Sequence, residues 1–132
     1  ALGDTLDEPS THPEPEMDHH QAATEANACV EILNADPNNA PARERLARLF
    51  AEHLDQPDQG IEQATLLLDL PDQPEARRAE WLGLIAAWHI RYRHDHDAAR
   101  EALDRLVRDF PHTPQALSAR RRLQLWAAEP KT

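Results

Sequence analysis

Residues 81–114 read WLGLIAAWHIRYRHDHDAAREALDRLVRDFPHTP. The segment begins with an apolar run at 81–88, becomes polar at 94–97, and then carries apolar residues at helical spacing over 98–110. Prolines at positions 111 and 114 end this pattern, because proline removes a helical hydrogen bond. The segment therefore predicts a helix, a tight reversal, a second helix and a proline stop.

The rest of the chain repeats this plan with variations. Asn39 is suited to cap a second helix, Asp72 with Glu75 resembles a capping pair, and Asp97 is expected to cap a fifth helix. A turn is expected over 55–60, which contains a proline and a glycine. The expected helices span residues 17–35, 41–54, 61–70, 74–92, 98–110 and 114–128.

Composition favours one all-α domain. The chain has 132 residues, only three glycines and an excess of good helix formers. Its net charge is −10, and residues 1–36 hold nine acidic side chains with no lysine or arginine. A general nucleic-acid surface would be basic, so this charge argues against that class. We expect an acidic, proline-containing disordered arm over 1–15, a helical repeat domain over 16–128 and a frayed tail over 129–132.

Prolines mark a repeat. Pro37, Pro71 and Pro111 are 34 and 40 residues apart, and each interval holds two amphipathic helices. A helix pair that recurs at this period is typical of an α-solenoid, in which neighbouring pairs must stack to bury their apolar faces.

The same residues give the chain a resemblance to tetratricopeptide repeat proteins over about 20–128. Residues 36–42 resemble the linker between repeats, and Leu82-Gly83 resembles the Leu-Gly pair at which a small residue lets two helices approach. Residues 99–110 resemble the second helix of a repeat. The pair at 41–70 departs from the family because its second helix is short. The register around Trp81 and Trp88 is ambiguous, and other helical-repeat arrays stay open.

The resemblance implies an all-α, right-handed α-solenoid of about six helices in stacked antiparallel pairs. It also implies a non-enzymatic scaffold that binds a peptide or a partner helix in a concave groove, with no cofactor and no contact with nucleic acid. The groove positions carried over from the family are Glu44, Arg48, Glu52, Glu80, Trp88 and Arg121.

Two alternatives stay open beside the scaffold. The last helix has apolar residues available for another surface, so the chain could be a self-associating module of a larger membrane-anchored protein. A histidine-based metal-binding protein is the other. Residues 109–116 resemble linkers of bacterial outer-membrane assembly and cell-envelope proteins, which favours a periplasmic or membrane-anchored soluble domain. The longest apolar run, 81–88, is too short to cross a bilayer, so direct membrane insertion is not expected.

Other residues that could carry chemistry have simpler interpretations. His94, His96 and the upstream His89 could ligate zinc or nickel, but a solvated turn is favoured because a site needs three or four converging ligands. Cys29 lies on an apolar stripe with Ala22, Ala26, Val30 and Leu33, which favours a buried structural thiol. Trp81, Trp88 and Tyr92 are expected in the core, with Trp88 the one that could reach the groove. Arg120, Arg121 and Arg122 are expected on a solvated helix face. No phosphate-binding loop or catalytic motif occurs, so no catalytic residue is predicted.

Overall fold

The computed structural model describes residues 17–129, so the arm predicted over 1–15 and residues 130–132 of the predicted tail lie outside the described residues. The described part is all-α, as predicted, and contains no strand. Its elements in chain order are α1 (His19–Ala35), α2 (Ala40–Arg48), η2 (Leu49–His53), α3 (Pro57–Leu68), α4 (Glu75–Trp88), η3 (His89–Arg93), α5 (His96–Asp109) and α6 (Pro114–Ala128).

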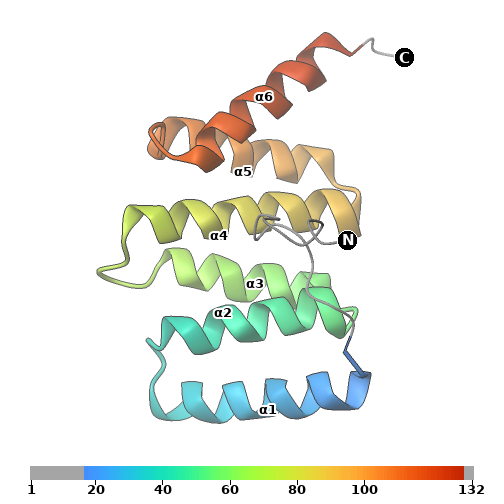
Figure 1. The fold of residues 1–132 in the computed structure, drawn as a ribbon, viewed down its shortest axis with the longest axis vertical. Coiled ribbons are helices and arrows are strands. Elements are labelled where there is room, and N and C mark those ends of the chain that lie inside the picture. Colours follow the sequence, from blue (N-terminus) through green and yellow to red (C-terminus); the bar gives the residue numbers. More distant parts are fainter. Residues whose placement is uncertain (1–16, 130–132) are drawn as a thin grey trace, which may run out of the picture.

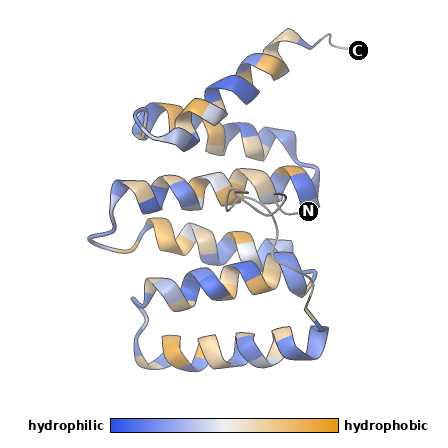
Figure 2. Ribbon diagram, viewed as in Figure 1, coloured by the Kyte–Doolittle hydropathy of each residue, from blue (hydrophilic) through white to orange (hydrophobic). Residues whose placement is uncertain are grey.

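The helices lie side by side in chain order along the long axis of the molecule (Figure 1). Each helix contacts the one before and the one after it, and α4 also contacts α6. Successive helices alternate in direction, so α2, α4 and α6 run the same way. Every helix mixes polar and apolar residues, which leaves each with a face to bury and a face for water (Figure 2).

The two helices predicted over 41–54 and 74–92 are each divided in the structure. Both end in one π-helical turn, η2 after α2 and η3 after α4. Left-handed residues follow these turns, Asp55 with φ 55° and His94 with φ 52°. A π-turn rotates the residues that follow it relative to a regular helix. Both π-turns carry side chains that line the groove described below.

The helix starts differ from the sequence prediction in three places. The turn predicted over 55–60 is wrong, because α3 begins at Pro57, a favoured first position, and Gly60 lies inside it. Asp95 and not Asp97 caps α5, accepting a hydrogen bond from the Ala98 backbone N–H at 3.0 Å. No side chain caps α4, so the predicted capping pair at its start is also wrong.

One other helix start matches the prediction, and one helix end is stabilised by an arginine that was not predicted. The Asn39 side chain accepts a hydrogen bond from the backbone N–H of Ala42 at 2.9 Å, which confirms the predicted cap of α2. The last carbonyls of α3 have no partner within the helix. The Arg78 guanidinium donates to the carbonyl of Leu68, the last residue of α3, at 2.9 Å and to that of Leu70, two residues beyond it, at 3.0 Å. This arginine fixes the turn between α3 and α4.

Two separate hydrophobic clusters hold the stack together. The smaller joins α1 to α2 and η2 through Ala22, Ala26, Cys29, Leu33, Ala42, Leu46 and Leu49. The larger extends from α2 to α6 around Trp81, which is completely buried. Trp81 and Trp88 both lie in the larger cluster, which confirms the prediction of core tryptophans. Val30 does not join the stripe predicted for it, because 40% of its surface is exposed.

Two helices approach closely at Gly60, and much less closely at Gly83, where the resemblance implied a close approach. A Cβ atom at Gly60 would lie 2.7 Å from the Ala51 Cβ and 2.8 Å from the Ala47 carbonyl oxygen. At Gly83 the nearest atom to such a Cβ is the Gln115 Cγ, at an ordinary contact distance of 3.7 Å. Gly60 therefore allows α3 to lie close to α2 and η2, whereas the space at Gly83 can take a methyl group without a clash.

Alanine at these two glycines should change stability in opposite directions. Gly60→Ala should lower the free energy of unfolding by about 1–3 kcal/mol, because backbone atoms cannot move away from the new methyl group. Gly83→Ala should raise it by about 0.5–1 kcal/mol, the gain of helix propensity in an uncrowded helix interior. Urea unfolding followed by circular dichroism measures both. Equal effects of the two substitutions would contradict this packing.

Candidate functional site: a groove along α2, α4 and α6

One groove of about 810 Å³ follows the face where α2, α4 and α6 lie next to one another. Between α4 and α6, the bottom of the groove is formed by residues of α5. The lining consists of Glu44, Arg48 and Glu52 from α2 and η2; Arg77, Glu80, Gly83, Leu84, Ala86, Ala87, Trp88, Ile90 and Arg91 from α4 and η3; Leu103 and Leu106 from α5; and Pro114, Gln115, Ser118, Ala119 and Arg122 from α6.

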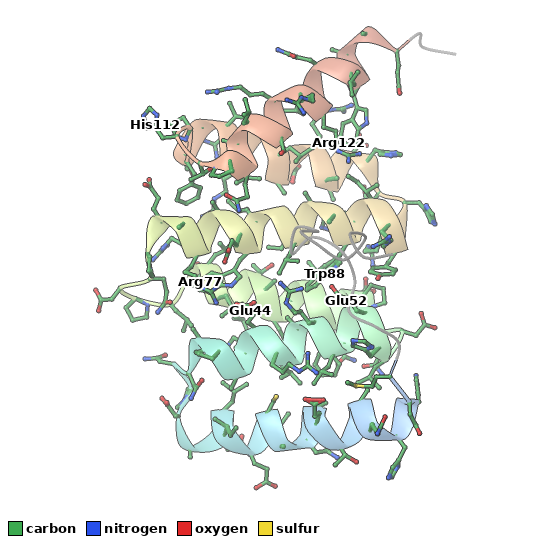
Figure 3. All side chains as sticks on the ribbon, in the orientation of Figure 1. Glu44, Glu52, Arg77, Trp88, His112 and Arg122 are labelled. Carbon is green, nitrogen blue, oxygen red and sulfur yellow. The ribbon has the colours of Figure 1, made fainter. Side chains whose placement is uncertain are left out.

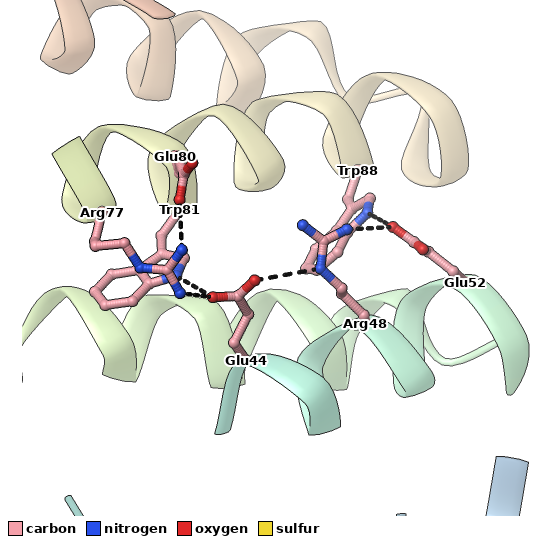
Figure 4. Close-up of polar contacts among 7 residues, drawn as sticks. All are labelled: Glu44, Arg48, Glu52, Arg77, Glu80, Trp81 and Trp88. Carbon is pink, nitrogen blue, oxygen red and sulfur yellow. Dashed lines mark hydrogen bonds and ion pairs between the residues drawn. The ribbon is translucent and has the colours of Figure 1, made fainter. Parts of the chain in front are cut away.

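The half of the groove between α2 and α4 is built from a chain of paired charges (Figure 4). Glu44 receives three donors. Its Oε1 accepts from the Arg77 guanidinium and, at 3.0 Å, from the indole Nε1 of Trp81. Its Oε2 lies 3.4 Å from the Nε of Arg48. Arg77 also donates to Glu80 at 2.8 Å, so the paired charges extend along α4.

Glu52 forms the other end of this charge chain. Its side chain is only 5% exposed, and its Oε2 accepts from the Trp88 indole Nε1 at 3.2 Å and lies 3.7 Å from Arg48 Nη1. Its Oε1 is buried and has no hydrogen-bond partner in the described structure. Burial, and next the Glu52 carboxylate, raise the pKa of Tyr92 above its usual value. The Glu52 side chain therefore lies in a poorly solvated place, with Arg48 and the Trp88 indole as its polar neighbours.

Four of the residues predicted for the groove, Glu44, Arg48, Glu52 and Glu80, line it, and their side chains pair with groups of the protein itself. Trp88 was expected in the core and as the tryptophan that could reach the groove; it is buried, with 2% of its surface exposed, and it lines the groove. Figure 3 shows Glu44, Glu52, Arg77 and Trp88 gathered between α2 and α4, with Arg122 on α6.

Arg121 does not line the groove, and its neighbour Arg122 does. The buried residues of α6 are Ala116 and Ala119, and one position along a helix turns a side chain by about 100°. The half of the groove between α4 and α6, including Leu84, Ala87 and Arg91, was not predicted from the sequence. The spacing of 84, 87 and 91 is a helical stripe, and it could have been found by continuing from Glu80 along α4.

No histidine within residues 17–129 lines this groove. His96 packs edge-on against Trp126, with ring centroids 5.1 Å apart, and His94 occupies a left-handed turn position. Within residues 17–129 no three side chains of His, Cys, Asp or Glu are grouped so that they could hold a metal ion.

Cys29 is buried in the smaller hydrophobic cluster. Desolvation by this burial, followed by the charge of Glu25, raises the pKa of the thiol, and Arg45 opposes them. A thiol with a raised pKa stays protonated near neutral pH, where the thiolate is the nucleophile. This agrees with the structural role predicted for Cys29.

None of the helices in the described part of the chain is both long and apolar enough to span a membrane. Comparison of the chain with models of protein families, with curated proteins and with solved structures finds no significant match.

Proposed function

We propose that this chain is a tetratricopeptide-like right-handed α-solenoid that acts as a non-enzymatic scaffold and binds a peptide or a partner helix in the groove along α2, α4 and α6. The proposal is supported by helices that stack in chain order and by a π-turn at the end of both α2 and α4. The cell-envelope setting implied by residues 109–116 stays a prediction.

One observation carries the proposal: the groove crosses three helices that run in the same direction and is lined by side chains of each. Its volume of about 810 Å³ lies within the range that ligand sites occupy. Its α4–α6 half offers partly exposed apolar surface, at Leu84, Ala87 and Ile90, beside polar groups of α6 such as Ser118. Such a surface can take an amphipathic segment that buries apolar side chains and hydrogen-bonds at its edge.

The test uses peptides selected on the immobilised domain from a phage-displayed library of random sequences. Binding of the enriched peptides is then measured by fluorescence anisotropy on the native chain and on Ala87→Arg, which places a long cation in the groove. Ala28→Arg on α1 is the matched control, since Ala28 is equally an exposed helical alanine but does not line the groove. We expect Ala87→Arg to weaken binding by about tenfold or more, equivalent to ~1.4 kcal/mol.

Two results would refute the scaffold function. One is a library from which nothing is enriched by the native domain. The other is a set of peptides that bind Ala87→Arg as tightly as the native chain and Ala28→Arg. Circular dichroism of both variants separates a blocked groove from a lost fold.

Self-association is a second candidate, favoured by one exposed helix face. Leu117 and Leu125 of α6 are 58% and 62% exposed, and they lie four residues on either side of Arg121. Exposed leucines on the end helix of a stacked array can pack against another copy. Light scattering that finds a strict monomer at high protein concentration would remove this candidate.

A further inference from the structure

The charges that line the groove are unevenly paired. The groove contains three carboxylates, those of Glu44, Glu52 and Glu80, and each of them has an arginine of the protein within ion-pair distance. It contains four guanidinium groups, and only those of Arg48 and Arg77 make these ion pairs. The remaining two belong to Arg91 and Arg122.

Arg91 and Arg122 have no carboxylate partner within the described residues. Both are exposed and contact aromatic side chains: Arg91 lies 6.0 Å from the ring centroid of Tyr92 and also hydrogen-bonds that side chain, and Arg122 lies 6.0 Å from the ring centroid of Trp126. A ring fixes the direction of a guanidinium without neutralising it. The groove thus has a net positive charge, whereas the whole chain carries −10.

The two arginines lie toward the same end of the groove. Arg91 belongs to η3, which ends α4, and Arg122 belongs to the second half of α6. Because α4 and α6 run in the same direction (Figure 1), Arg91, just beyond the end of α4, and Arg122, just past the middle of α6, are both displaced in that direction. Leu84 and Ala87, which give this half of the groove apolar surface, precede Arg91 along α4 and η3. Seven residues separate Leu84 from Arg91, which is about 10 Å along a helix.

We propose that the groove binds an acidic segment of a partner protein, with side-chain carboxylates on Arg91 and Arg122 and an aliphatic side chain on Leu84 and Ala87. This inference rests on the proposed function and adds the chemistry of the ligand. Guanidinium groups suit carboxylates because each offers several directed donors. In an extended segment a span of about 10 Å corresponds to about three residues, so the aliphatic residue and the acidic residue are three apart.

The same arrangement disfavours a basic ligand. A lysine or arginine side chain near Arg91 and Arg122 would meet like charge, and the carboxylates at the α2–α4 half are already engaged. A cationic partner would therefore have to break an internal ion pair to gain one. Charge complementarity of this kind sets partner choice and association rate more than it sets total affinity.

The test compares two double variants with the same change in charge. Arg91→Gln with Arg122→Gln removes the unpaired cations, whereas Arg120→Gln with Arg121→Gln removes two exposed arginines of α6 that do not line the groove. The probes are fluorescein-labelled peptides enriched from the random library, each paired with a copy in which every Asp and Glu is changed to Asn and Gln. Anisotropy is measured at low and at physiological salt.

We expect enriched peptides to contain Asp or Glu three residues from Leu, Ile or Val. Their affinity should fall about tenfold or more in the Arg91 and Arg122 variant and in the neutralised peptides. It should stay close to the native value in the Arg120 and Arg121 variant. The affinity of the native chain should also decrease with salt, and this dependence should be weaker for the first variant.

Other outcomes are decisive as well. Peptides that require an open groove, as shown by Ala87→Arg, but carry no acidic excess or do not respond to the loss of Arg91 and Arg122 would overturn the inference while the scaffold function stands. If no peptide depends on the groove, the scaffold function itself fails. A labelled peptide of residues 1–16, which has five acidic residues and no lysine or arginine, is the last probe. If it alone binds with this arginine dependence, the ligand is a segment of the chain itself and the partner assignment is wrong.

Discussion

Trp81→Ala is expected to lower the free energy of unfolding by about 3–5 kcal/mol, the range found when a large buried aromatic side chain is removed from a core. Trp81 is fully buried in the larger hydrophobic cluster, which extends from α2 to α6. Its indole also donates to Glu44, and the Arg77 guanidinium lies 5.5 Å from its ring centroid. The substitution therefore opens a cavity and removes a donor from the paired charges at once.

Urea denaturation followed by circular dichroism measures this loss, and Trp126→Ala is the matched control. Trp126 lies on the last helix and is only partly buried, so its removal should cost clearly less. The change in tryptophan fluorescence between the native chain and each variant reports the contribution of the ring that was removed. A Trp81→Ala protein that unfolds at the native urea concentration would mean that this residue is not at the centre of the core.

Arg48→Met should have the second largest effect, a loss of about 2–4 kcal/mol. Arg48 is 18% exposed and lies between the carboxylates of Glu44 and Glu52, the latter only 5% exposed. Removing one partner of a buried ion pair leaves an uncompensated charge in a poorly solvated place, which costs more than the pair contributes. Methionine keeps much of the apolar volume of the side chain, so the change acts mainly on charge.

A double-mutant cycle separates the charge effect from packing. Glu52→Gln in the Arg48→Met background should recover part of the lost stability, because the unpaired carboxylate is then gone. Arg105→Met is the control: Arg105 pairs with Asp109 in the same i,i+4 relation, but both side chains are about two-fifths exposed. Exposed pairs contribute about 0–1 kcal/mol. Equal losses at Arg48 and Arg105 would contradict the importance of burial.

Much of this architecture could be predicted from the sequence because it depends on periodicity. The spacing of apolar residues indicated six helices, and the bounds 114–128 predicted for the last one match the structure. The π-turns could not be predicted, since η2 and η3 continue the apolar pattern of α2 and α4. The start of α3 was predicted too late because Pro57 and Gly60 were interpreted as breakers, although proline favours the first turn of a helix.

The groove was harder to predict than the helices, because it depends on which neighbour a side chain meets. Glu44, Arg48, Glu52 and Glu80 line it as expected, but the contacts of Glu44 with Arg77 and Trp81, and of Glu52 with Trp88, depend on the distance between α2 and α4. The sequence of either helix alone does not determine that distance. An error of one position on α6 selected Arg121 in place of Arg122, and with it the unpaired cation was missed.

The division of the hydrophobic residues into two clusters separates the first helix from the rest of the protein. α1 contributes only to the smaller cluster, mainly through small side chains, and it provides no residue to the groove. Units of this kind can open independently while the remainder keeps its protected amides. Detachment of α1 would uncover Leu46 of α2 and Leu49 of η2 and leave Trp81, Trp88 and the paired charges in place. The helices that line the groove can therefore stay packed together while α1 detaches.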